Sequence, residues 1–186
     1  MKAYARSYHE TPKTMVIESL DESIFAVKLL LSHFKTSEEF TPFRRGVLGY
    51  PATILMFSII DTLGYLLIGE LVSIDGLNKQ IDKKNTFRVL NSKFFGLDLT
   101  SVVIDKLYNY CRNQLTHNAT LPKHFTLSLS DSVTFIQTTD LTEKGKYVIH
   151  LLGMEKACLK AIYILKNDER GKSVLNDSKK TKKFIC

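Results

Sequence analysis

The sequence feature that most constrains the fold is a long apolar stretch, residues 51–69, that is interrupted by a single acid. Its 19 residues run from Pro51 to Gly69, and Asp61 lies at the centre beside two hydroxyl side chains. A stretch of this length could almost span a bilayer, but a carboxylate at bilayer depth is costly. The mean hydropathy of the whole chain is only −0.06. We therefore expect no membrane span, and a helix that is buried on most sides in a protein core.

Other segments have the periodicity of helices, which predicts an all-α fold. Apolar residues between 13 and 34 recur at helical spacing, with the acids early, where the helix dipole favours them. We expect a short helix at 86–96, another from residue 98 to about 118, and a long final helix from about 143 to 166. The polar residues 76–85 are expected to form a connection.

One segment changes period. Residues 125–138 alternate apolar and polar side chains on both sides of Asp131 and Ser132, which predicts a β-hairpin inserted before the last helix. With 186 residues, the chain is long enough for one core but short for two domains. We expect an up-and-down helical bundle that carries this hairpin, in a single domain over residues 1–166.

Positive charge is concentrated near the C-terminus. The net charge is +7, and residues 166–186 contain seven Lys or Arg against three Asp or Glu. Residues 167–186 are therefore predicted to be a basic, flexible tail, which either solubilises the protein or contacts RNA. The excess of positive charge favours polyanionic partners such as nucleic acid or acidic lipid.

The three cysteines, Cys111, Cys158 and Cys186, form no disulfide or metal-binding pattern. We expect neither a metal nor another cofactor. The first 15 residues lack the apolar core of a secretory signal, so the cytoplasm is the expected location. The motifs of serine hydrolases, phosphate-binding loops and zinc proteases do not occur in the sequence.

The residues best suited to chemistry lie near the end of the helix predicted at 98–118. Arg112, Asn113 and His117 fall within six positions, and Asn113 and His117 share a helical face. Arg112 and His117 are about 140° apart on a regular helix, so they converge only if the helix ends or distorts near His117, or if the arginine reaches round. A guanidinium binds phosphate, and a histidine carries protons near neutral pH. The helix dipole also favours both residue types here without any function.

The spacing of Arg112, Asn113 and His117 resembles the R-x4-6-H motif of the HEPN superfamily, in its R-N-x-x-x-H form. The resemblance covers about residues 13–166 in architecture and 108–123 in residues. It implies a compact helical bundle. Many members are metal-independent endoribonucleases, including toxins of toxin–antitoxin pairs and effectors of antiviral and abortive-infection systems, whereas some members have lost cleavage.

The resemblance implies roles for further residues. The family often places an acidic or polar residue on an earlier core helix, facing the motif, and Asp61 is the position that fits. A buried carboxylate needs a partner, and Arg112 is the obvious one. Lys123 and His124 are candidate RNA contacts, or equally well solvated loop residues. Tyr108 could stack on a base, although we expect it to pack.

The reaction that the resemblance implies is attack of an RNA 2′-OH on the adjacent phosphorus, which gives a 2′,3′-cyclic phosphate and a 5′-OH. His117 would act as general base or acid, Arg112 would neutralise phosphoryl charge, and Asn113 would orient His117 or the phosphate. One histidine cannot easily be both acid and base, and the family dimerises so that two motifs face one cleft. We therefore expect a homodimer with a composite site. Any antitoxin would be a separate chain, since the sequence contains no nucleotidyltransferase motif.

Two other functions stay open at this point. A HEPN-like fold without cleavage would be a binding module that docks a protein partner or nucleic acid. An unrelated helical interaction protein would carry the motif by accident. Two copies of His117 that approach one cleft would separate the first two functions from the third, and an activity assay would separate the ribonuclease from the binding module.

Overall fold

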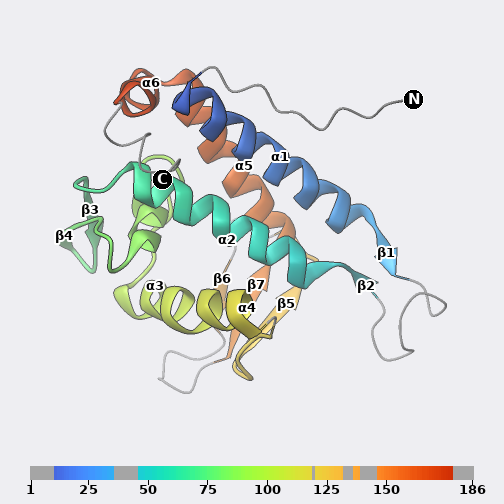
Figure 1. The fold of residues 1–186 in the computed structure, drawn as a ribbon. Coiled ribbons are helices and arrows are strands. Elements are labelled where there is room, and N and C mark those ends of the chain that lie inside the picture. Colours follow the sequence, from blue (N-terminus) through green and yellow to red (C-terminus); the bar gives the residue numbers. More distant parts are fainter. Residues whose placement is uncertain (1–10, 36–45, 119, 132–135, 139–145, 178–186) are drawn as a thin grey trace, which may run out of the picture.

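The chain folds mainly into helices, in a computed structural model that describes residues 11–35, 46–118, 120–131, 136–138 and 146–177 (Figure 1). The mainly helical fold class that we predicted is therefore confirmed. The helices of these ranges are α1 (Pro12–Ser32), α2 (Gly49–Leu66), η1 (Thr86–Asn91), α3 (Ser101–Lys106), η2 (Leu107–Arg112), α4 (Asn113–Asn118), α5 (Leu151–Asn167) and α6 (Glu169–Asn176).

Three long helices, α1, α2 and α5, lie side by side, and α1 contacts both of the others (Figure 1). α1 begins at a capping box, in which the hydroxyls of Thr11 and Thr14 each accept the other's backbone N–H. The amphipathic helix predicted at 13–34 is confirmed, apart from its last two residues. Its buried residues recur every three or four positions: Val16, Leu20, Ile24, Val27 and Leu31.

α2 is buried on most sides, as predicted, because it contacts α1, α5 and η1. None of the helices in the described part of the chain is long and apolar enough to cross a membrane. Asp61 lies on the outer side of α2, where its side chain is 23% exposed. The residues that α2 contributes to the core are Ala52, Thr53, Met56, Phe57, Ile59, Ile60, Leu63, Gly64 and Leu66.

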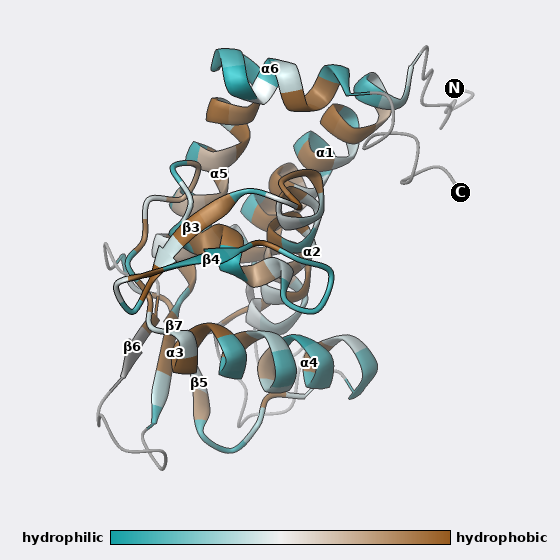
Figure 2. Cartoon of the chain, turned by 90° about the vertical axis from the view of Figure 1, so that its left-hand side faces the viewer, coloured by the Kyte–Doolittle hydropathy of each residue, from teal (hydrophilic) through white to brown (hydrophobic). Residues whose placement is uncertain are grey.

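A β-hairpin that we did not predict follows α2. Strands β3 (Leu71–Ile74) and β4 (Leu77–Gln80) are antiparallel, and Ile74 pairs with Leu77 across a two-residue turn. The turn residues Asp75 and Gly76 both have positive φ, 54° and 73°, which the Asp-Gly pair tolerates. Figure 2 shows β3 as the hydrophobic strand and β4 as the hydrophilic one. The interpretation of 76–85 as a polar connection is therefore wrong for β4.

The helix predicted from residue 98 to about 118 is confirmed as three successive segments, α3, η2 and α4. It begins at Thr100, whose hydroxyl accepts the backbone N–H of Val103 at 3.4 Å. The middle segment, η2, is π-helical. We call the whole of 101–118 the motif helix. The short helix predicted at 86–96 is present only as the 3₁₀-helix η1, which ends at Asn91.

The predicted hairpin at 125–138 is wrong, because its two strands do not pair with each other. The three-stranded sheet has the order β5–β7–β6, with β5 at Phe125–Ser128, β6 at Ile136–Thr138 and β7 at Tyr147–His150. β7 lies between the other two, parallel to β5 and antiparallel to β6. The final helix was predicted from 143, but α5 begins only at Leu151 because β7 occupies the preceding residues.

A last helix, α6, occupies part of the segment that we predicted to be a flexible tail from residue 167. Val174 and Leu175 are buried in it, and Arg170 pairs with Glu70 at 3.0 Å. At Gly171 a Cβ would lie 2.3 Å from the carbonyl oxygen of Leu165, so only glycine allows this close approach to α5. Residues 169–176 are therefore a packed helix. The rest of the predicted tail, residues 178–186, lies outside the described residues.

Candidate functional site

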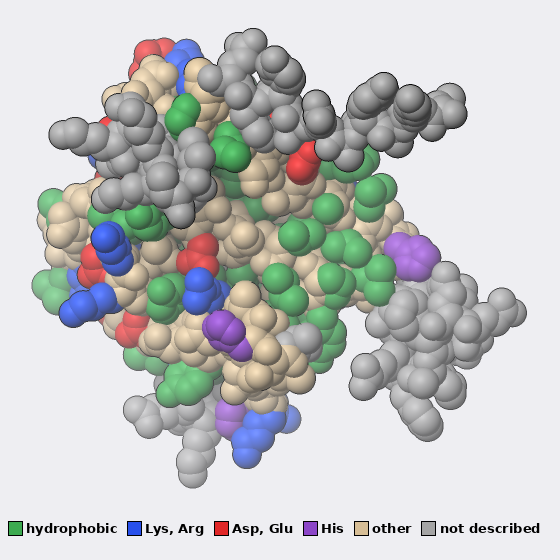
Figure 3. All heavy atoms as spheres, in the orientation of Figure 1, with side chains coloured by type: hydrophobic (Ala, Val, Ile, Leu, Met, Phe, Trp, Pro, Cys, Tyr) green, Lys and Arg blue, Asp and Glu red, His purple; other side chains and the backbone are tan. Residues whose placement is uncertain are grey.

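Asp61 and Arg112 meet where α2 crosses the motif helix. The Nε of Arg112 donates to Oδ2 of Asp61 at 2.8 Å, as the sequence predicted for the carboxylate's partner. The side chain of Arg112 is 32% exposed and that of Asp61 is 23% exposed, so solvent reaches both groups. On the face seen in Figure 3, an acidic, a basic and a histidine side chain follow one another across the junction of α2 and α4.

Thr86 is a functional-site neighbour that the sequence did not reveal. Its hydroxyl donates to Oδ1 of Asp61, so the carboxylate receives one donor on each oxygen. The contact depends on Gly64, since a Cβ there would lie 2.2 Å from the carbonyl oxygen of Thr86. A lone glycine inside an apolar helix is a signal for such a close approach.

Asn113 holds the guanidinium from the other side. Its Oδ1 accepts from Nη1 of Arg112 at 3.0 Å, and its Nδ2 donates to the carbonyl oxygen of Asn109 at 3.1 Å. The amide is thereby fixed at both ends. In the structure, the Asn113 side chain orients Arg112, and no side-chain hydrogen bond joins it to His117 within the described part of the chain.

The Arg112 backbone belongs to the π-helical segment η2. π-helical turns are rare in proteins, and those that occur are often found at functional sites. Side chains supply hydrogen bonds around the widened turn: Asn113 donates to the carbonyl of Asn109, and the Thr116 hydroxyl donates to the carbonyl of Arg112. The widened turn therefore ends at Arg112, the residue that pairs with Asp61.

Tyr108 packs, as expected. Its ring lies edge-to-face against Phe87, with centroids 5.5 Å apart, and the guanidinium carbon of Arg112 lies 5.5 Å from its centre. Tyr108 thus joins the arginine to the core by a cation–π contact. This arrangement makes it a supporting residue for Arg112.

His117 lies on α4, five residues beyond Arg112, and is exposed. The helix between these two residues is regular, because the π-helical segment ends at Arg112. In the described residues no hydrogen bond or ion pair of the His117 side chain links it to Asp61, Arg112 or Asn113. The structure of one copy therefore brings together three of the four predicted catalytic residues and leaves the histidine facing solvent.

A cavity of about 170 Å³ opens beside the Asp61–Arg112 pair. Its walls combine the ion pair with two hydroxyls and with apolar side chains of α2 and α4. A guanidinium at the edge of such a cavity is placed to meet an anion that enters from solvent. The lining residues are Ile54, Phe57, Ser58, Asp61, Arg112, Leu115 and Thr116.

The two predicted RNA contacts that follow the motif, Lys123 and His124, are both exposed in the loop before β5. His124 lines a different cavity, together with Lys106 and Tyr110 of the motif helix. The carbonyl of His124 accepts the backbone N–H of Tyr147 at 2.8 Å, which fixes the loop to β7. This hydrogen bond therefore attaches the loop to the sheet.

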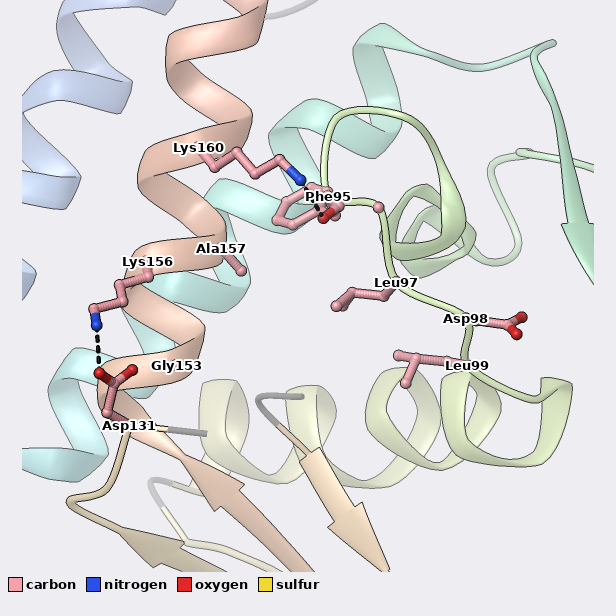
Figure 4. A pocket seen from close by; sticks show the side chains of 10 residues that line it. Phe95, Leu97, Asp98, Leu99, Asp131, Gly153, Lys156, Ala157 and Lys160 are labelled. Carbon is pink, nitrogen blue, oxygen red and sulfur yellow. Dashed lines mark hydrogen bonds and ion pairs between the residues drawn. The ribbon is translucent and has the colours of Figure 1, made fainter. Parts of the chain in front are cut away.

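A larger cavity, of about 510 Å³, lies between residues 95–99 and the first half of α5 (Figure 4). Three of its four charged side chains have partners, and the fourth, Asp98, has none among the described residues. Lys156 pairs with Asp131, and Lys160 donates to the carbonyl oxygen of Phe95 at 3.5 Å. None of the residues predicted for the site lines it, and it contains no pair of groups suited to proton transfer.

Other chemistry finds little support in the described ranges. No group of three or more His, Cys, Asp or Glu that could hold a metal occurs among them. Cys111, next to Arg112, is fully buried, and burial raises the pKa of its thiol, so it is not an available nucleophile. The chain matches no protein-family model, and neither a curated protein nor a solved structure is significantly similar to it.

Proposed function

We propose that this chain is a HEPN-like endoribonuclease, of the toxin or antiviral-effector type, that cleaves RNA without a metal ion at a site completed by a second copy. The observation that carries the proposal is the Asp61–Arg112 pair beside an open cavity. An acid on a core helix and the arginine of an R-N-x-x-x-H motif meet as the resemblance requires. The helices α1, α2 and α5 together with the motif helix would form the bundle.

Arg112 keeps donors for a substrate. A guanidinium has five N–H donors, of which the structure uses one on Nε for Asp61 and one on Nη1 for Asn113. The others have no partner among the described residues and lie at the cavity edge. Two partners hold the planar group in place, so little order is lost when a phosphate binds.

The proposed reaction uses one proton donor and one acceptor. His117 of one copy takes the proton of the RNA 2′-OH, whose oxygen attacks the adjacent phosphorus. The P–O5′ bond breaks, and the 5′ oxygen takes a proton from His117 of the second copy. Arg112 neutralises charge on the non-bridging oxygens. The products are a 2′,3′-cyclic phosphate and a 5′-OH, and no metal enters the reaction.

An apolar surface supports the pairing of two copies. Phe25 and Leu29 are one turn apart on α1 and are 62% and 54% exposed, and Tyr50 at the start of α2 is 47% exposed. Hydrophobic side chains gather over α1 and α2 on the face that also shows the acidic, basic and histidine side chains (Figure 3). A symmetric contact through this face would bring two motifs to one cleft.

The test is RNA cleavage in EDTA by the wild type and by the Arg112→Ala and His117→Ala variants. We expect cyclic-phosphate ends from the wild type, and a loss of about 100-fold or more in each variant, the range in which acid–base catalysis contributes. Arg88→Ala is the matched control, because Arg88 also pairs with one aspartate at 2.8 Å and is exposed to a similar degree, 26%.

Other outcomes would contradict the proposal. If cleavage survives both variants, it arises from another site or a contaminant. If a folded, dimeric wild type cleaves none of several RNAs, a binding module becomes the better assignment, and the separation of His117 from Arg112 in one copy is the observation that favours it. Arg112→Ala would then still weaken RNA or partner binding.

A further inference from the structure

A second cavity, of about 390 Å³, lies on a different side of the motif helix from the Asp61–Arg112 pair. It is bounded by residues of this helix, by the loop before β5, and by the first residues of the strands β5 and β7. Cavities of this size accommodate small ligands or one unit of a polymer. The lining residues are Lys106, Tyr110, Pro122, His124, Phe125 and Tyr147.

The walls of this cavity are aromatic. Phe125 and Tyr147 stack at 4.9 Å with an angle of 19° between their rings, and both are buried. They form a rigid floor. Tyr110 lines the same cavity with 57% of its surface exposed. An exposed tyrosine over a cavity offers a ring face for stacking.

The same cavity is positively charged. The Lys106 ammonium lies 4.9 Å from the centre of the Tyr147 ring, and the exposed His124 also lines the cavity. Lys123 and Lys146, next in sequence to His124 and Tyr147, are also exposed. No acid lines the cavity among the described residues. Asp105, the neighbour of Lys106, accepts a hydrogen bond from the Asn85 side chain at 2.6 Å and does not line the cavity.

We propose that this cavity binds one nucleotide of single-stranded RNA, with the base stacked on Tyr110 and the phosphate held by Lys106 and His124. Aromatic faces combined with cations are the means by which proteins bind single strands without reading their sequence. A duplex hides its base faces, so it would not use Tyr110. The cavity would hold the strand, and the residues around Arg112 would act on it.

The choice of RNA rests on the proposed function, whereas the stacking and charge of the cavity do not. Tyr110 and Arg112 are two residues apart and project to different sides of the motif helix, so removing Tyr110 leaves the Asp61–Arg112 pair in place. We therefore expect the cavity to affect KM and not kcat. This difference separates a substrate-holding role from a catalytic one.

The experiment measures binding of a fluorescent ten-nucleotide RNA in which every ribose is 2′-O-methylated. Such an RNA lacks the attacking hydroxyl, so binding is measured whether or not the protein cleaves. We expect Tyr110→Ala to raise Kd by roughly tenfold, the effect of losing one stacked base. Lys106→Gln should weaken binding and reduce its salt dependence. Tyr163→Ala is the matched control, since Tyr163 is also an exposed tyrosine, at 69%, and lies on α5.

A Kd that Tyr110→Ala leaves unchanged would overturn the inference, as would equal affinity for a duplex of the same sequence or for inorganic polyphosphate. Tyrosine-dependent binding without cleavage of unmodified RNA would support the cavity and contradict the proposed ribonuclease. Cleavage with a KM insensitive to Tyr110→Ala would support the ribonuclease and contradict the cavity. Binding of a protein in preference to RNA, lost in Tyr110→Ala, would also overturn it.

Discussion

Asp61 illustrates how one side chain can join three elements. Its carboxylate accepts from Thr86 on η1 and from Arg112 on the motif helix, while its backbone belongs to α2. The arrangement requires η1 to lie directly against α2, and Gly64 permits this approach because it has no Cβ. A change at Gly64 should therefore affect both stability and the site.

We predict that Gly64→Ala lowers the free energy of unfolding by about 1–3 kcal/mol, the usual effect of overpacking a core. Alanine normally stabilises a helix relative to glycine, but here its Cβ would lie 2.2 Å from a backbone oxygen that cannot rotate away. Urea unfolding followed by circular dichroism measures the change. Gly49→Ala is the control, because its Cβ would meet only the ends of two leucine side chains at 3.2 Å. An equal effect of both variants would show that the approach of η1 is not what matters.

For single residues, the sequence predicted a contact where a charged side chain in an apolar helix requires a partner of opposite charge. A lone acid in an apolar helix must have a partner, and the nearest suitable cation in the motif, Arg112, is that partner. The hydroxyl of Thr86 could not be predicted, because its position depends on how closely two elements pack. The exposed position of His117 follows from a regular helix after Arg112, and the distortion that we considered lies before Arg112 instead.

Among the elements, α6 is held by the residue that precedes it, Asp168. Asp168 caps the helix, accepting from the backbone N–H of Arg170 at 2.9 Å, and also receives the Lys93 ammonium at 2.7 Å. The Lys93 ammonium and the backbone N–H of Arg170 hold the pKa of Asp168 below its ordinary value. The ionised form of Asp168 is thus more stable in the folded chain than in the unfolded chain.

We predict that α6 loosens in acid through Asp168. Because the folded pKa is lowered, the stabilisation is complete above the ordinary aspartate value of about 4 and is lost as pH falls through the lowered pKa. Amide exchange of α6 followed by NMR from about pH 5 to pH 2 should show this loss. In Asp168→Asn, which keeps a capping side chain without the charge, α6 should be less protected at pH 5 and should lose less protection in acid. The same acid loss in both proteins would contradict the role of Asp168.

The elements that the sequence did not predict share a cause. Residues 147–150 form β7, yet only His150 separates their apolar residues from those that begin α5, and a short apolar run fits a strand or a helix equally well. Their pairing with β5 and β6 is set by tertiary contacts, so 125–138 looks like a hairpin from its own residues alone. The β3–β4 hairpin had a local signal, the Asp75-Gly76 pair, but β4 is polar after Leu77 and lacks the apolar alternation that predicts a strand.

For the whole molecule, the proposed function requires two copies. We predict a dimer in sedimentation, and a loss of at least tenfold in dimer affinity for Phe25→Glu, because a charge would be buried in the apolar contact. Leu71→Glu is the control, since Leu71 is as exposed as Phe25 but lies on the β3–β4 hairpin. Cleavage should fall together with dimerisation. A Phe25→Glu protein that stays dimeric would place the contact elsewhere.

The π-helical turn changes the directions in which the residues on its two sides project from the motif helix. In an α-helix each residue advances the angle by about 100°, and the π-helical residues 107–112 advance it by less. α4 therefore follows α3 with a changed phase. A helical wheel drawn through 101–118 as one regular helix would assign the polar residues near Arg112 to the wrong directions, so the phase must be counted separately on each side of the widened turn.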